Sequence, residues 1–116
     1  MDTLKQVGNV DELDQALAES RARPVLLFKH STTCPISEHA LRELKSFLDG
    51  AGGAVNAKLI TVQTAPDVSA AVAERLGLRH ESPQAILVRD GREVWNASHY
   101  AITFAAIDEA IRAVQR

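Results

Sequence analysis

The feature that most constrains the fold is an uninterrupted apolar run that a helical pattern follows closely. The run Val-Leu-Leu-Phe at 25–28 comes directly after Pro24, and a polar segment begins at Ser31. Four consecutive apolar residues bounded by a proline and a polar turn are typical of a strand that is buried on both faces. Because such a strand needs helices on both sides of its sheet, the run predicts an α/β protein with a central strand at 25–30.

Further patterns along the chain predict an alternation of strands and helices. Apolar residues at three- and four-residue steps predict helices at roughly 10–18, 35–48, 68–76 and 104–114, and β-rich runs predict strands at roughly 4–7, 57–62, 85–89 and 93–97. Asn9 or Asp11 caps the first helix, the second ends within 49–53, and Gly77 follows the third. The pair Asp90-Gly91 predicts a two-residue hairpin turn.

This order of elements predicts a particular α/β arrangement. Strand–helix–strand units come first, and a hairpin and a closing helix follow them. Connections of this kind imply a central mixed β-sheet flanked by helices on both faces. The pattern therefore predicts a thioredoxin-like fold, although other small α/β folds share parts of this order.

Length and composition predict one soluble domain. The 116 residues suit a single domain spanning 1–116, and 46% hydrophobic and 24% charged residues are ordinary for a globular protein. A net charge of -2 gives no field that would gather nucleic acid. The sequence contains no apolar run of the roughly 18 residues that a membrane span needs, and residues 1–6 lack the apolar core of a signal peptide. We therefore expect a cytoplasmic monomer that binds neither nucleic acid nor membrane.

Cys34 is the single cysteine of the chain, and it lies between the predicted central strand and the next helix. Pro35 suits the first position of that helix. The unpaired N–H groups and the dipole at a helix N-terminus favour a thiolate, the nucleophilic form of cysteine. Lys29 and His30 end the strand nearby and add positive potential. A free cysteine is otherwise often a small buried hydrophobe, but this position predicts a reactive thiol.

Ser37 occupies the position three residues after the cysteine, where a dithiol motif has its second thiol. Its hydroxyl can donate a hydrogen bond to the Cys34 sulfur, but it cannot form a disulfide with it. A mixed disulfide on Cys34 must therefore be resolved by a second molecule, so the predicted chemistry is monothiol. The four histidines have no ligand-type spacing with Cys34, and no metal site is expected.

A second motif, Ser82-Pro83, precedes the predicted strand at 85–89. In a thioredoxin-like fold a proline at this position is cis and faces the active cysteine, and we expect the same of Pro83. His80 comes three residues earlier and is a candidate to line the substrate groove. His39 is expected to face solvent, and His99 to be a loop residue.

Three segments of the chain together resemble the monothiol bacilliredoxin family. They read His-Ser-Thr-Thr-Cys-Pro-Ile-Ser at 30–37, His-Glu-Ser-Pro-Gln at 80–84, and Ala-Ser-His at 97–99 followed by Ile-Thr at 102–103. The resemblance implies a thioredoxin-fold oxidoreductase that removes bacillithiol from mixed disulfides on proteins.

The same resemblance implies roles for individual residues. Cys34 would be the nucleophile that receives the bacillithiol moiety, and Pro83 the cis-proline beside it. The substrate would contact residues around this pair: Thr33, Pro35, Ser37, Ser82, Lys29 and His80. Bacillithiol would be a co-substrate rather than a bound cofactor, and its malate carboxylates would meet Lys29, Arg79 or His80.

Two departures from the family pattern affect the ligand more than the thiol. The stretch at 66–70 reads Pro-Asp-Val-Ser-Ala, with an acid where the family commonly has a base or proline, and Tyr100 replaces a tryptophan. Two other functions remain open on the sequence. One is a thiol peroxidase, since Ser31 and Cys34 have the spacing of a peroxidase motif, and the other is a non-catalytic binding module.

Overall fold

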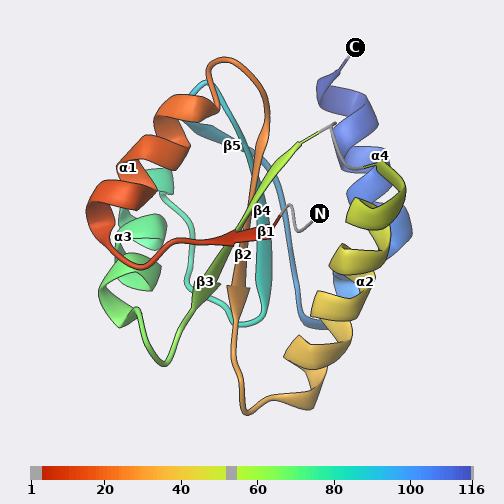
Figure 1. Ribbon diagram of the computed structural model, residues 1–116, viewed down its shortest axis with the longest axis horizontal. Helices are drawn as coiled ribbons and strands as arrows, with labels where there is room; N and C mark the ends of the chain where they lie inside the picture. The colour runs from red at the N-terminus through yellow and green to blue at the C-terminus, as the bar shows by residue number, and fades with distance from the viewer. Residues whose placement is uncertain (1–3, 52–54, 116) are drawn as a thin grey trace.

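The computed structural model describes residues 4–51 and 55–115, which form one sheet between two layers of helices (Figure 1). The five strands lie in the order β1-β3-β2-β4-β5. β1 and β2 each pair with β3 in parallel, whereas β4 is antiparallel to both β2 and β5. The elements in chain order are β1 (Leu4–Gln6), α1 (Val10–Glu19), β2 (Val25–His30), α2 (Pro35–Ala51), β3 (Asn56–Thr61), α3 (Pro66–Leu76), β4 (Gln84–Arg89), β5 (Arg92–Ser98), the 3-10 turn η1 (His99–Ala101) and α4 (Phe104–Val114).

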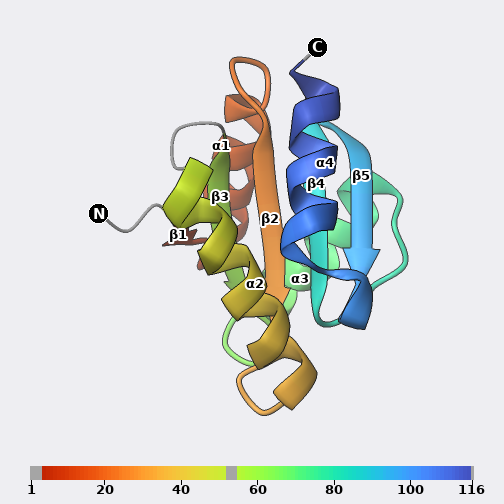
Figure 2. The ribbon, with the colours of Figure 1, turned by 90° about the vertical axis from the view of Figure 1, so that its right-hand side faces the viewer.

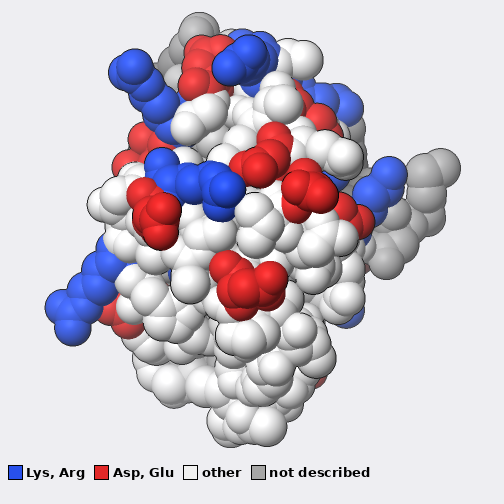
Figure 3. Space-filling view, turned by 90° about the vertical axis from the view of Figure 1, so that its left-hand side faces the viewer, with Lys and Arg blue, Asp and Glu red and all other residues white. Residues whose placement is uncertain are grey.

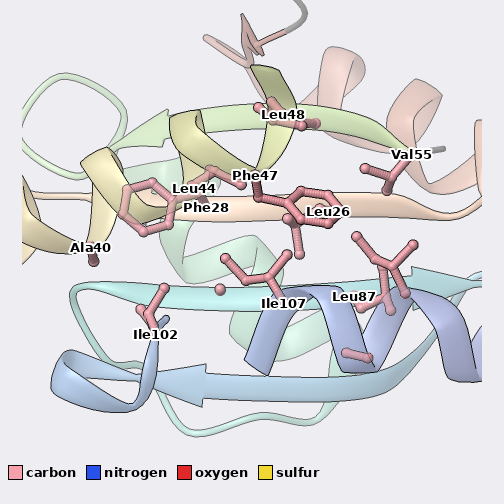
Figure 4. Close-up of a cluster of buried hydrophobic side chains, with 14 residues drawn as sticks. Leu26, Phe28, Ala40, Leu44, Phe47, Leu48, Val55, Leu87, Ile102 and Ile107 are labelled. Carbon is pink, nitrogen blue, oxygen red and sulfur yellow. The ribbon is translucent and has the colours of Figure 1, made fainter. Parts of the chain in front are cut away.

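Both faces of the central strand β2 are buried, as its apolar run predicts. α1 and α3 cover one face of the sheet, and α2 and α4 cover the other (Figure 1). Leu26 and Phe28 pack with α2 and α4, in the cluster drawn in Figure 4, whereas Val25 and Leu27 belong to the cluster beneath α1 and α3. Each of these side chains is fully buried and contributes about 1.5–3 kcal/mol relative to an exposed one. The fold is therefore the predicted mixed sheet with helices on both faces.

Several local signals in the sequence act as predicted. Asn9 caps α1, because its side-chain oxygen accepts a hydrogen bond from the backbone N–H of Glu12 at 2.9 Å. Gly77 ends α3 in the left-handed conformation, at φ +65°. Asp90 and Gly91 both have positive φ, as a type I′ hairpin turn between β4 and β5 requires.

Several element boundaries differ by one or two residues from the predicted ranges. α2 ends at Ala51, within the predicted 49–53, and it continues through Gly50 because one helical glycine costs only about 1 kcal/mol relative to alanine; Gly52 and Gly53 lie outside the described residues. β3 begins and ends one residue earlier than expected. The sequence patterns did not predict η1. Within the described residues, no helix is both long and apolar enough to span a bilayer.

Candidate active site

Four strand ends meet at one edge of the sheet, which lies at the lower end of the molecule in Figure 2. β2 ends at His30 opposite Thr61 of β3, β4 begins at Gln84, and β5 ends at Ser98 opposite Gln84. In an open α/β sheet, ligands bind outside the carboxyl ends of the parallel strands. The segment that contains Cys34 leaves β2 at this edge, so the topology places the thiol where such sites occur.

Cys34 is a partly exposed free thiol immediately before α2. Its backbone carbonyl accepts the N–H of Glu38 at 3.1 Å, and its own N–H donates to the carbonyl of Ser31 at 3.4 Å. The residue thus has the hydrogen bonding of a helix N-cap. An open hollow of about 350 Å³ lies beside the thiol, lined by Thr32, Thr33, Cys34, Pro35 and Glu38. Of the predicted substrate-contacting residues, Thr33 and Pro35 lie here.

Ser37 does not lie in this hollow, and the expected hydrogen bond to Cys34 is replaced by another. Its side chain is fully buried, with its hydroxyl oxygen 2.7 Å from Nδ1 of His30. The same oxygen accepts the N–H of Ser31 at 2.9 Å. Burial lowers the pKa of His30, which favours the neutral ring and lets Nδ1 accept the serine proton. Ser37 therefore fastens the start of the Cys34 segment to β2 and cannot contact a substrate at the surface.

Gln63 is a residue of this site that the sequence analysis missed. Its amide nitrogen donates to the hydroxyl oxygens of Ser31 at 2.8 Å and Thr33 at 3.3 Å, while its amide oxygen accepts the N–H of Thr32 at 3.2 Å. One side chain thus holds all three residues before the thiol. The only signal in the sequence is its position just after a strand that ends at the same edge.

Lys29, predicted to contact the substrate, lies on the opposite side of the sheet from α2, away from the hollow beside Cys34. The side chain is fully buried, and its Nζ lies 3.1 Å from Nδ1 of His80, which is also 3.2 Å from the hydroxyl of Ser69. Desolvation lowers the pKa of Lys29 to about 8. It also lowers the pKa of His80, and the charge on Lys29 adds to this effect.

The His80 ring borders a different cavity from the hollow beside Cys34. This cavity measures about 410 Å³ and is lined by α3 and its flanking loops: Val62, Pro66, Ser69, Ala70, Ala73 and His80. Figure 3 shows the α1 and α3 side of the molecule, where charged side chains gather toward the upper part. The lower end, where the β2–α2 loop lies in Figure 1, presents mostly uncharged atoms on this side.

The Ser82–Pro83 peptide bond is cis, as expected. Pro83 is buried just ahead of β4, and its carbonyl accepts the N–H of His99 at 3.1 Å. The Ser82 hydroxyl is also covered, so a substrate at the surface could meet the backbone of this residue but not its side chain. In residues 4–51 and 55–115, no group of three or more His, Cys, Asp or Glu side chains is placed to hold a metal ion.

Several solved structures share this fold. A protein described provisionally as an oxidoreductase with a thioredoxin fold is 30% identical, with a TM-score of 0.85 and 93% of each chain covered. A poplar thioredoxin h mutant is 17% identical, with a TM-score of 0.79 over 97% of this chain and 83% of that one. Thioredoxin from Fasciola hepatica is 14% identical, with a TM-score of 0.76 over 94% of this chain and 97% of that one.

The fold and the thiol at the head of α2 define a thioredoxin-fold protein with a role in thiol–disulfide redox chemistry. Residues 5–107 match the sequence profile of the family described as Monothiol bacilliredoxin BrxC. The chain belongs to this family, as the three motifs indicated.

Proposed function

We propose that this chain removes bacillithiol from mixed disulfides on proteins, with Cys34 as the nucleophile. The observation that carries the proposal is the environment of the thiol, which is partly exposed at the start of α2, whereas the serine three residues later is buried. Family membership supports the choice of bacillithiol as the thiol. The substrates are then bacillithiolated proteins, and the working compartment is the cytoplasm.

The reaction proceeds in two exchanges. The Cys34 thiolate attacks the bacillithiol sulfur of the mixed disulfide, and the protein thiolate leaves with the electron pair of the broken S–S bond. Cys34 now carries bacillithiol in a new disulfide. The thiolate of a second small thiol attacks that adduct at the bacillithiol sulfur, which releases a disulfide of the two small thiols and restores the Cys34 thiolate; the disulfide is symmetrical when the second thiol is bacillithiol.

Residues around the thiol have separate parts in this proposal. The N-terminus of α2 stabilises the attacking and leaving thiolate through its unpaired N–H groups and dipole. Thr33 and Pro35 line the hollow that receives the small thiol. Gln63 holds the loop before the thiol through three hydrogen bonds, and the backbone at Ser82–Pro83 forms a wall of the site.

The test is turnover of a reporter protein that carries bacillithiol on one cysteine. Wild-type protein with free bacillithiol should release the reporter thiol, and mass spectrometry should find bacillithiol on Cys34 when the second thiol is withheld. Cys34→Ser should abolish release. Ser37→Ala is the matched control and should keep most activity per folded molecule, because its hydroxyl bonds to His30 rather than to the sulfur.

Different results would identify the alternatives. Release by Cys34→Ser at the wild-type rate would refute the mechanism. Consumption of hydrogen peroxide by the reduced protein, without release from the reporter, would instead support a thiol peroxidase. Inactivity in both assays would leave a binding module.

A further inference from the structure

His99 has a backbone conformation that residues with a side chain seldom adopt. Its φ is +56°, and among the described non-glycine residues it shares a positive φ only with Asp90. Asp90 lies in the hairpin turn, where that conformation closes the β4–β5 connection. His99 instead begins η1, and glycine would adopt the left-handed region there without the penalty that a side chain brings. The imidazole at this position therefore carries a conformational cost that glycine would avoid.

The backbone places His99 beside the proline of the candidate site. Its N–H donates to the carbonyl of Pro83, and β5 ends at the same sheet edge from which the Cys34 segment leaves (Figure 2). Its neighbour Tyr100 lies against α2, with its ring centroid 6.5 Å from that of His39. η1 thus borders both Pro83 and the helix that Cys34 precedes.

The imidazole of His99 is open to a ligand. The side chain is 45% exposed, and within residues 4–51 and 55–115 no protein group forms a hydrogen bond with its ring nitrogens. Its nearest charged neighbour is Glu81, with 4.0 Å between Nε2 and a carboxylate oxygen. The other oxygen of Glu81 lies 3.8 Å from Nε of Arg79, whose side chain is 91% exposed.

Arg79 and His99 thus place two N–H donors around the carboxylate of Glu81, which neither of them holds closely. Both distances exceed the 2.7–3.2 Å or so of a direct N–H···O bond, so Glu81 leaves the donors of Arg79 and His99 available. Donors of this kind bind carboxylates, and charge-assisted bonds are the stronger ones. Arg79 and Glu81 precede Ser82 and Pro83 in the chain, and the backbone N–H of His99 donates to the Pro83 carbonyl, so both donors lie close to the cis-proline loop.

We propose that His99 is a specificity-determining residue that donates a ring N–H to a carboxylate of the small thiol, with Arg79 as the accompanying cation. The inference rests on the proposed function and deepens it: the favoured substrates are mixed disulfides whose small thiol carries a carboxylate. The side chain of His99 thus takes the place in recognition that the sequence analysis gave to the buried Lys29.

The test compares two forms of one reporter protein, carrying either bacillithiol or the uncharged 2-mercaptoethanol on the same cysteine. His99→Gly removes the imidazole and relieves the backbone conformation. Asp90→Gly is the matched control, because it relieves the same φ in the remote hairpin. With His99→Gly we expect KM for the bacillithiol reporter to rise about tenfold, the loss expected for one charge-assisted hydrogen bond. Its kcat, and both constants for the 2-mercaptoethanol reporter, should stay at wild-type values.

The controls separate a recognition role from a structural one. Neither glycine variant should lower the melting temperature, and Asp90→Gly should match wild type with both reporters. An equal loss with both reporters, or no loss with either, would overturn the role of His99 while leaving the proposed function in place. A wild-type protein that releases neither small thiol would refute the proposed function itself, and the role of His99 with it.

Discussion

Lys29 is a fully buried cation, and replacing it tests the energetics of the polar cluster beneath α3. Desolvation lowers its pKa from 10.5 to about 8 in the folded protein. The unfolded chain therefore binds the proton more tightly, and the charged form opposes folding. A difference of about 2.5 pKa units corresponds to about 3 kcal/mol. The contact with His80 offsets about 1 kcal/mol of this cost.

Lys29→Met keeps the length of the side chain and removes the charge. We expect the free energy of unfolding to rise by about 2 kcal/mol at neutral pH. The variant is relieved of the desolvation cost of about 3 kcal/mol but loses the contact with His80, worth about 1 kcal/mol. Because the folded pKa is lowered, the cost is fully present below pH 8 and declines as the pH rises toward 10.5. Near pH 9.5 about 1 kcal/mol of the desolvation cost remains. This about equals the lost contact with His80, so wild type and variant should then be about equally stable.

Urea unfolding at both pH values measures this difference directly. Lys5→Met is the control, because Lys5 is an exposed lysine on the edge strand β1 and its removal should change stability little at either pH. A Lys29→Met variant that is less stable than wild type at neutral pH would refute the reasoning. So would a stability difference that does not shrink as the pH rises.

Three further substitutions probe the surroundings of the thiol. Ser37→Ala should destabilise the fold by about 2 kcal/mol in urea unfolding, because it leaves the buried His30 ring without its partner; a loss below about 0.5 kcal/mol would contradict the contact. Gln63→Met should lower kcat/KM about three- to tenfold, because it frees the loop before the thiol from three hydrogen bonds. Unchanged kinetics would show that the loop keeps its position without Gln63. Glu38→Gln should speed alkylation of the thiol about two- to threefold, since a carboxylate beside the hollow opposes the thiolate, and the gain should fall with added salt. A slower reaction would indicate that Glu38 assists the thiol.

The fold could be predicted because its signals are local. The apolar run at 25–28 requires a doubly covered strand, and Asp90-Gly91 sets the hairpin that makes the sheet mixed. Gly77 and Asn9 are end signals read within one helical turn. Each depends on neighbours only a few positions away, so no knowledge of the tertiary structure was needed.

A residue of the candidate site could be predicted only where its position between a strand and a helix determines its place in the site. Cys34 and Pro35 follow from the strand–helix junction, but the partners of Lys29, Ser37 and Gln63 depend on packing. Because side chains alternate along β2, Lys29 points to the α3 side of the sheet, as Leu27 does. Its closeness to Cys34 in sequence had suggested the other side. Gln63 meets the loop through contacts that span about 30 residues, and no periodicity signals them.

The outer strand β5 has features that disfavour pairing with a strand of another molecule. Its outer backbone groups form an edge that could pair with another chain. A shift in the β4–β5 register between Leu87 and Val88 breaks the regular ladder, and bulges of this kind increase local twist. Along the strand, Arg92 is exposed and Glu93 accepts a hydrogen bond from Asn96 at 2.8 Å. Twist and charge together disfavour the addition of a strand from another molecule at this edge of the sheet.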